Sequence, residues 1–237
     1  MNKAIIATVA IAIPCMMSTG ILFSLTVLYF TGVLHLGTTK SYNLNTSFFS
    51  LFYCLPLFAG YLSDKYLDAK KILVIGLTFS SAGFFLLSIN ILLTLSLTFM
   101  AVGGGCFLPS IWKLLNNAAD RVPRKRLNSF VLSYSALAVS SLISSFLAGF
   151  AANKYGYSVV FLIGAIFNLI SLCVFFVNRG LYPKASAYCS SGYGFILLAV
   201  GIACTYLLMS NATLCEYIIY FTSLSIVVFF HIYIYKE

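Results

Sequence analysis

Five charged side chains lie within eight residues of a chain that carries little charge elsewhere. The segment GYLSDKYLDAKK, residues 60–71, holds two carboxylates and three amines, on Asp64, Asp68, Lys65, Lys70 and Lys71. Apolar stretches flank it, FFSLFYCLPLFA before and ILVIGLTFSSAGFFLLSI after. Such a mixture of charges can form ion pairs, and Asp68 stands where the N-terminus of a following helix favours an acid. We therefore predict a charged turn between two helices, and we expect Gly60 to let the first helix pack closely.

Residues suited to enzymatic or metal chemistry do not come together elsewhere in the sequence. There is no nucleophile–base pair, and the Gly103-Gly104-Gly105 run is inside an apolar stretch, unlike a phosphate-binding loop. The seven cysteines form no Cys-x-x-Cys pair, which predicts small core-packing residues and neither a disulfide framework nor a metal site. We therefore expect no enzyme, no cofactor and no metal.

The composition predicts that a lipid bilayer is the solvent of this chain. It has 237 residues, is 61% hydrophobic and only 8% charged, and its mean hydropathy is +1.01. A soluble domain has about a quarter of its residues charged. The net charge of +9 is interpreted as cytoplasmic loop lysines and arginines, because no basic stripe with aromatic stacking residues accompanies it. Nucleic-acid binding is therefore not expected.

A membrane span needs about 20 mostly apolar residues, and hydropathy on this basis predicts an all-α, polytopic helical bundle of about eight spans. The N-terminal span is interpreted as retained, since Ile13-Pro14 before Cys15 is a poor signal-peptide cleavage site. The third and fourth spans meet near Ser88-Ile89-Asn90 and are expected to form a hairpin. The predicted span cores are 5–34, 46–63, 72–90, 91–115, 129–152, 157–178, 193–210 and 214–235.

The distribution of positive charge predicts the orientation of the bundle. If the N-terminus is cytoplasmic, only Lys40 and Lys154 of the 14 lysines and arginines fall on the outer side. Cytoplasmic loops carry the excess of Lys and Arg in membrane proteins. We therefore predict an integral protein of the plasma or inner membrane with both termini in the cytoplasm.

Small residues and prolines inside the spans are candidates for close helix packing and for helix bends. Residues 140–145 add four serines to the fifth span. Close packing without any transport role explains each of these residues equally well. The helix-bend candidates are Pro14, Gly103, Gly104, Gly105 and Pro109.

A short internal repeat suggests two related halves of opposite orientation. AGYLSDKY, residues 59–66, ends the second predicted span, and AGFAANKY, residues 148–155, ends the fifth. Four of the eight positions are identical. The two spans end on opposite sides, which is typical of the three-plus-three inverted repeats of secondary transporters.

The charged turn resembles the loop between spans two and three of the major facilitator superfamily. Its pattern is roughly G-x-L-a-D-R/K-x-G-R/K-R/K, which Gly60, Leu62, Asp64, Lys65, Lys70 and Lys71 match, with Asp68 where a glycine is usual. Within that superfamily the chain is most similar to the proton-dependent oligopeptide transporters. The similar segments are VLYFTGVLHLG (27–37), LFYCLPLFAGYLSDKYL (51–67), GGGCFLPS (103–110) and the layout of residues 128–176.

The resemblance implies alternating-access transport of a small solute or a di- or tripeptide, through a site between two six-span halves. It further implies that the chain is truncated and diverged. The family's charged E-x-x-E-R motif corresponds here to the uncharged AIPCM of residues 12–16, and its fourth-span lysine corresponds to Leu108. Proton relays need an ionisable group within the membrane. We therefore do not expect proton coupling.

Polar or amphipathic residues in apolar spans are the candidates for the solute pocket. For each of them, a hydroxyl bonded to its own helix backbone is an alternative interpretation. Tyr134 also matches a binding-site tyrosine of the oligopeptide transporters. The candidates are Ser18, Thr19, Tyr53, Tyr134 and Ser141.

The predicted domain organisation is a six-helix N-terminal transporter half at 1–178, a cytoplasmic linker at 179–192 and two further helices of an incomplete second half at 193–237. The partners considered are the lipid bilayer, a small solute or a di- or tripeptide, and another copy of the chain or a missing C-terminal half. The alternative hypothesis is a truncated, non-transporting remnant or a membrane scaffold or regulatory protein.

Overall fold

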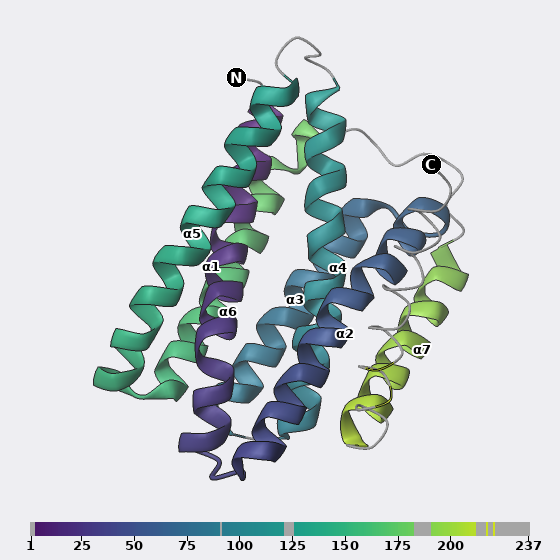
Figure 1. The fold of residues 1–237 in the computed structure, drawn as a ribbon. Helices are drawn as coiled ribbons and strands as arrows, with labels where there is room; N and C mark the ends of the chain where they lie inside the picture. The colour runs from purple at the N-terminus through teal and green to yellow at the C-terminus, as the bar shows by residue number, and fades with distance from the viewer. Residues whose placement is uncertain are drawn as a thin grey trace, which may run out of the picture.

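The fold is a bundle of long helices that run alternately up and down (Figure 1). The computed structural model describes residues 3–90, 92–120, 126–182, 191–211, 217 and 220. Within these residues, seven helices are long and apolar enough to cross a membrane, which confirms the predicted membrane bundle. The predicted span 214–235 lies outside the described residues except for two positions. The helices are α1 (Lys3–Gly32), α2 (Thr38–Lys65), α3 (Ala69–Ser88), α4 (Leu93–Ala119), α5 (Arg126–Tyr155), α6 (Tyr157–Asn178) and α7 (Ser191–Ser210).

Each predicted span core within the described residues coincides with a helix, and some helices extend beyond these cores through polar residues. The predicted hairpin between the third and fourth spans is confirmed, because α3 ends at Ser88 and α4 begins at Leu93. The predicted span core 46–63 lies within α2, which begins at Thr38, eight residues before position 46. Hydropathy detects only the part of a helix that is apolar enough for the bilayer core. The first residues of α2, TTKSYNLNT, are helical but polar, so hydropathy does not include them in the span.

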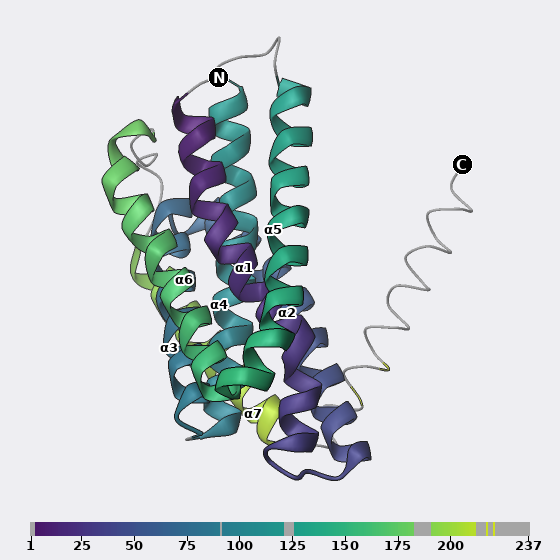
Figure 2. The ribbon, with the colours of Figure 1, turned by 90° about the vertical axis from the view of Figure 1, so that its left-hand side faces the viewer.

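The six helices α1–α6 pack as two groups around a shared core. α1 packs against α5 and α6, while α4 packs against α2 and α3, and α3 also contacts α6. Figure 2 shows α1 between α5 and α6. α7 contacts α4 and α2 (Figure 1). The largest fully buried side chains are aromatic and include Tyr29, Phe30, Phe48 and Phe161.

Close approach of α3 and α4 depends on glycine. A Cβ atom on Gly103 would stand 2.5 Å from the backbone nitrogen of Ser80, and one on Gly76 would stand 2.7 Å from that of Phe107. Gly104 packs against the ring of Phe52, and a Cβ on Gly105 would clash with Leu55. These residues therefore serve close packing. α4 continues as one helix through the three glycines and Pro109, as α1 does through Pro14, and a bend at these positions stays a prediction.

The two copies of the internal repeat lie at opposite ends of the bundle. Residues 59–66 complete α2 and lead into the turn to α3. Residues 148–155 complete α5 at the other end (Figure 1). Gly156 follows with φ +85°, a left-handed conformation that glycine adopts without strain, and it allows the abrupt reversal into α6.

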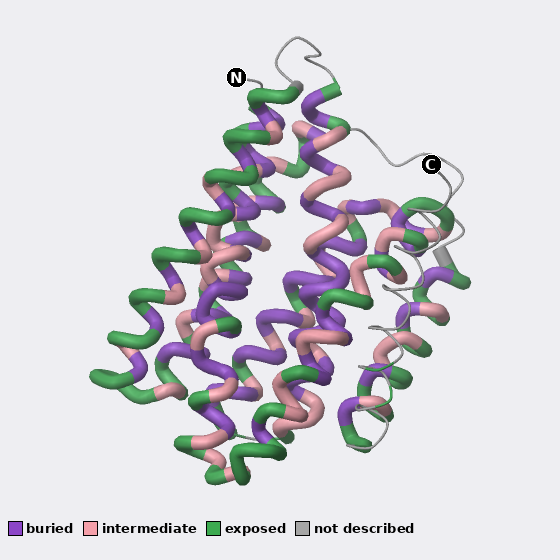
Figure 3. Tube along the Cα trace, viewed as in Figure 1, coloured by how far each residue is buried: buried purple, intermediate pink, exposed green. Residues whose placement is uncertain are grey.

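Apolar side chains cover much of the outer surface. Figure 3 shows exposed residues along α5 and α7, and among them are Leu142, Phe146, Phe150, Ile196 and Leu207. Such a surface requires lipid or another apolar partner in place of water. The expectation that the cysteines pack in the core is wrong for three of the five described ones. Cys15 and Cys106 are buried, but Cys54, Cys173 and Cys204 are exposed on this apolar surface.

Candidate functional site

The carboxylate of the charged turn forms an ion pair with a lysine from α4. The Nζ atom of Lys113 lies 2.6 Å from Oδ1 of Asp64. The same Nζ donates to the backbone oxygen of Ser63 at 2.8 Å and lies 3.1 Å from its Oγ. The side chain of Lys113 is 36% exposed and that of Asp64 is 71% exposed. Solvent therefore weakens the ion pair, and its contribution to stability is about 0–1 kcal/mol. The pair therefore positions the end of α2 on α4 more than it stabilises the fold.

A polar groove surrounds this ion pair where α2 ends beside α4. Its volume is about 370 Å³, and its lining residues are Gly60, Ser63, Asp64, Pro109, Lys113, Asn116 and Asn117. The expectation that Gly60 allows close helix packing is wrong, because an added Cβ would meet no atom within 4 Å. Gly60 instead contributes open space to the groove.

The other charges of the turn point to separate partners. Lys65 lies over the ring of Tyr61, with Nζ 4.9 Å from the ring centre. Nζ of Lys70 donates to the backbone oxygen of Tyr182 at 3.3 Å. Asp68 occupies the predicted position before α3, and its backbone oxygen accepts hydrogen bonds from the first turn, but its side chain makes no capping bond. The structure therefore divides the charges of the turn: Asp64 lines the groove beside α4, whereas Asp68, Lys70 and Lys71 line a second groove.

Two of the five pocket candidates are buried and bonded to their own helix. Oγ of Ser18 lies 2.7 Å from the backbone oxygen of Cys15, and Oγ1 of Thr19 donates to the same oxygen at 3.0 Å. Ser18 also lies 3.0 Å from Oδ1 of Asn168. These contacts match the alternative interpretation, in which the hydroxyls satisfy the protein and leave no group for a solute.

The two tyrosines among the candidates are exposed. They lie where the group of α1, α5 and α6 meets the group of α2, α3 and α4, a boundary that we call the seam. Tyr53 of α2 is 61% exposed and lies beside Phe23 of α1, with ring centres 6.2 Å apart. Tyr134 of α5 is 67% exposed and lies beside Trp112 of α4, with ring centres 6.5 Å apart. Each tyrosine therefore bridges from one helix group to the other.

The fifth candidate, Ser141, is half-buried where α5 crosses α1. The backbone of α5 approaches Gly20 closely there, and Oγ of Ser145 donates to the Gly20 oxygen at 2.9 Å. None of the five candidates lines the polar groove at Asp64 or any of four other cavities formed by the described residues. The candidates are therefore a divided set, with two exposed tyrosines, two buried hydroxyls and one half-buried serine.

Asn168 connects three helices through a buried hydrogen-bond network that the sequence reasoning missed. The side chain is fully buried in α6, and its Nδ2 donates to Oγ of Ser80 at 3.1 Å and to the Gly164 oxygen at 3.3 Å. Its Oδ1 faces Ser18 of α1. An asparagine in the middle of an apolar span was the signal that could have found it, because an amide in lipid requires partners.

Ionisable side chains lie near the ends of the described spans. Lys113 is the one placed deepest in these residues, six positions before α4 ends at Ala119. The remaining Asp, Lys and Arg residues of the seven helices lie in their first or last turns. Among the described residues, no group of three His, Cys, Asp or Glu side chains could hold a metal ion. The described bundle therefore offers hydroxyls, amides and aromatic rings at mid-depth.

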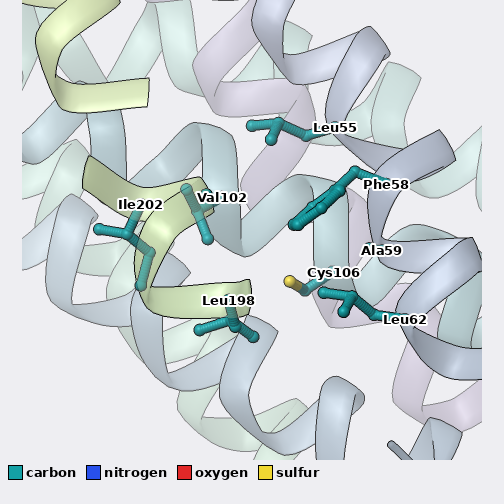
Figure 4. A pocket seen from close by; sticks show the side chains of 9 residues that line it. Leu55, Phe58, Ala59, Leu62, Val102, Cys106, Leu198 and Ile202 are labelled. Atoms are coloured by element: carbon teal, nitrogen blue, oxygen red, sulfur yellow. The ribbon is translucent and has the colours of Figure 1, made fainter. Parts of the chain in front are cut away.

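The junction of α2, α4 and α7 encloses a small apolar pocket (Figure 4). Leu55, Phe58, Val102, Cys106 and Leu198 are among its lining side chains, and Gly201 of α7 approaches the ring of Phe58. It has room for about one water-sized sphere, 10 Å³, and none of its lining side chains carries nitrogen or oxygen. It therefore serves helix packing.

Comparison with known proteins identifies relatives among peptide permeases. The chain is 28% identical over 156 residues to dipeptide and tripeptide permease A of Chromobacterium violaceum, which covers 64% of this chain and 32% of that protein. It is 30% identical over 139 residues to dipeptide and tripeptide permease B of Salmonella typhimurium, covering 57% and 28%. The chain thus spans about a third of the length of these curated relatives.

Solved structures match the fold over nearly all of this chain. A crystal structure of tetrameric PepTSo2 has a TM-score of 0.80 at 18% identity and covers 96% of this chain, which spans 53% of that one. A second structure, from work on substrate recognition in proton dependent oligopeptide transporters, has a TM-score of 0.78 at 18% identity. The match covers 97% of this chain and 53% of that one. The model of the Major Facilitator Superfamily matches residues 7–236. The chain therefore belongs to the major facilitator superfamily.

Proposed function

We propose that this chain is the pathway-forming half of a secondary transporter for di- or tripeptides or a similar small solute. The observation that carries the proposal is the agreement of the whole six-helix bundle with one half of peptide transporter structures. Sequence similarity to dipeptide and tripeptide permeases supports the substrate class. The second half of the pathway would come from another copy of the chain or from a further segment.

The seam between the two helix groups is the proposed solute-facing surface. Tyr53 and Tyr134 reach over it from opposite sides, and aromatic neighbours, including the stacked pair Phe23 and Phe49 at 4.8 Å, support them. Tyrosine offers a hydroxyl for hydrogen bonding and a ring for apolar contact. A surface of this kind suits a small peptide, which has both amide groups and side chains. Ser18 and Thr19 would support α1 behind this surface.

The polar groove at Lys113 and Asp64 would form the cytoplasmic end of the pathway. The proposal places this end inside because most of the lysines and arginines gather there. The ion pair joins α2 to α4, and it would break if these two helices separated. An exposed pair contributes about 0–1 kcal/mol, so breaking it costs little free energy.

Cysteine accessibility tests the proposed surface. In a background without exposed native cysteines, Tyr53→Cys and Tyr134→Cys should react with a membrane-impermeant maleimide, and excess dipeptide should slow both reactions. Ser18→Cys is the matched buried control and should stay unreactive. If both cysteines react with the maleimide at the same rate with and without dipeptide, the proposal that this surface binds peptide is wrong. Unreactive cysteines at both positions would show that the surface faces lipid.

A further inference from the structure

The groove between α3 and the end of α6 has a positively charged mouth and an apolar wall. Its volume is about 860 Å³. The start of α3 and the end of α6 lie toward the end of the bundle where α1 begins (Figure 2). Lys70 and Lys71 from the first turn of α3 and Arg179 after α6 line the mouth, together with Asp68. The wall that continues along the helices consists of Val74, Ile75, Phe175, Phe176 and Phe195.

The charges at the mouth are not explained by the helices that carry them. The N-terminal turn of a helix has a partial positive charge, so Lys70 and Lys71 are disfavoured at the start of α3. The ionised groups lining the groove are three cations and one carboxylate, which leaves an excess of positive charge. A negatively charged ligand at the mouth would offset both effects.

The backbone around the mouth is held in place by two hydrogen bonds. Lys70 donates to the backbone oxygen of Tyr182, and the hydroxyl of Tyr182 lies 3.0 Å from Oγ1 of Thr8 on α1. Burial raises the pKa of the Tyr182 hydroxyl, so this group stays protonated and able to bond at neutral pH. The end of α6 is thereby tied to α1 and α3.

We propose that this groove binds the phosphate of an anionic phospholipid, with an acyl chain against the apolar wall. Phe176 and Phe195 are exposed on the outer surface of the helices, where lipid has direct access. Basic pockets between spans at the cytoplasmic face suit anionic head groups, and the cytoplasmic leaflet carries anionic lipid. A soluble phosphate would use the cations but would leave the apolar wall uncovered.

Lipid affinity of matched variants tests this proposal. The double variant Lys71→Gln with Arg179→Gln removes two cations from the mouth and retains Lys70, which bonds to Tyr182. Lys40→Gln with Lys154→Gln makes the same charge change at the opposite end of the bundle. Native mass spectrometry of the full chain in detergent should show phosphatidylglycerol binding about 30-fold weaker in the first variant, the factor expected from two interfacial cations. The second variant should match the original chain.

Three results would overturn the proposal. They are unchanged phosphatidylglycerol affinity in the first variant, equal affinity of the original chain for phosphatidylcholine, and full competition by glycerol phosphate at equal concentration. The last result would assign the cations to a soluble anion. Unchanged helix content by circular dichroism is the control for folding.

A fluorescence measurement in membranes keeps the proposal testable if the charge variants fail to fold. Phe176→Trp in a Trp112→Phe background places the only tryptophan of the chain at the groove wall. In phosphatidylcholine vesicles with about 10% brominated phosphatidylglycerol, this tryptophan should be quenched more strongly than with about 10% brominated phosphatidylcholine. Equal quenching by the two brominated lipids would contradict a specific site.

Discussion

Nζ of Lys113 holds the end of α2 through contacts of two kinds, an ion pair with Asp64 and hydrogen bonds to Ser63. Only the ion pair depends on the carboxylate. Substitution of the lysine removes both kinds of contact, whereas substitution of the acid removes one. Lys113 therefore contributes more contacts to the end of α2 than Asp64 does.

We predict that Lys113→Met lowers the stability of the bundle more than Asp64→Asn does. The asparagine variant should change the free energy of unfolding by less than about 1 kcal/mol, because the pair is largely exposed. It should also insert normally while altering solute transport. Unfolding in detergent and insertion assays measure these effects. Equal destabilisation by both variants would show that the ion pair dominates the contact.

Asn168 should be more important for stability than its position in an apolar helix suggests. Asn168→Ala removes the partner of Ser18 and Ser80 in the core, and buried interhelical hydrogen bonds in membrane proteins contribute about 0.6–1.7 kcal/mol. Asn178→Ala is the matched control, because its Nδ2 bonds only to the Val174 oxygen of its own helix among the contacts described. Denaturant titration in mixed micelles should separate the two variants. Similar midpoints would contradict a role for the network.

At the scale of elements, small residues determine how α3 meets α4. The backbones of these helices approach closely at Gly76 and Gly103, and the contact leaves no space for a methyl group. The neighbouring atoms are backbone atoms, which cannot rotate away. The α3–α4 hairpin is therefore the part of the fold most sensitive to added volume.

We predict that Gly103→Ala destabilises the bundle by about 1–3 kcal/mol, the usual cost of overpacking. Gly60→Ala is the matched control on α2, because no atom lies within 4 Å of the added Cβ. Thermal unfolding monitored by circular dichroism compares the two variants. A larger effect at Gly60 than at Gly103 would mean that the helices cross elsewhere.

At the scale of the whole molecule, the described cations divide between two ends of the bundle. Lys40 and Lys154 lie at one end, and the turn from α2 to α3 lies at the other with Lys3 and Arg179 (Figure 1). Helices of alternating direction bring residues far apart in sequence to the same side. The end that carries more Lys and Arg is the expected cytoplasmic end, because cytoplasmic loops carry the excess of these residues.

We predict that both termini lie in the cytoplasm. A C-terminal reporter that is active only outside the cytoplasm should give no signal. A cysteine at Lys154 should react with impermeant reagent in intact cells, whereas one at Lys71 should react only after permeabilisation. Strong reporter activity would exclude the eight-span arrangement.

We also predict that this chain, reconstituted alone, does not accumulate peptide in response to a proton gradient. Coupling needs an ionisable group that binds and releases a proton within the membrane, and the described spans place such groups near their ends. Uptake of labelled dipeptide into liposomes with an inward proton gradient should equal uptake after an ionophore collapses it. Gradient-dependent accumulation above empty liposomes would identify a coupling residue elsewhere, and His35 would be the first to substitute.

The sequence alone determined the membrane bundle, the helix directions and the motif turn. Runs of apolar residues predict spans because the bilayer admits little else, and charge near Asp64 and Lys71 marks a turn because charges avoid lipid. These are local properties, and each can be evaluated within about 20 residues. The predicted hairpin at Ser88-Ile89-Asn90 succeeded for the same reason.

Only the tertiary structure decided which residues become partners. Lys113 and Asp64 are 49 positions apart, and Ser18 and Asn168 are 150 apart, so no local pattern links them. The same limit explains the wrong expectation for Gly60, since a glycine permits close approach but does not create it. Whether a small residue packs closely or opens a groove depends on where the neighbouring helix lies, and that position is set by the packing of the whole bundle.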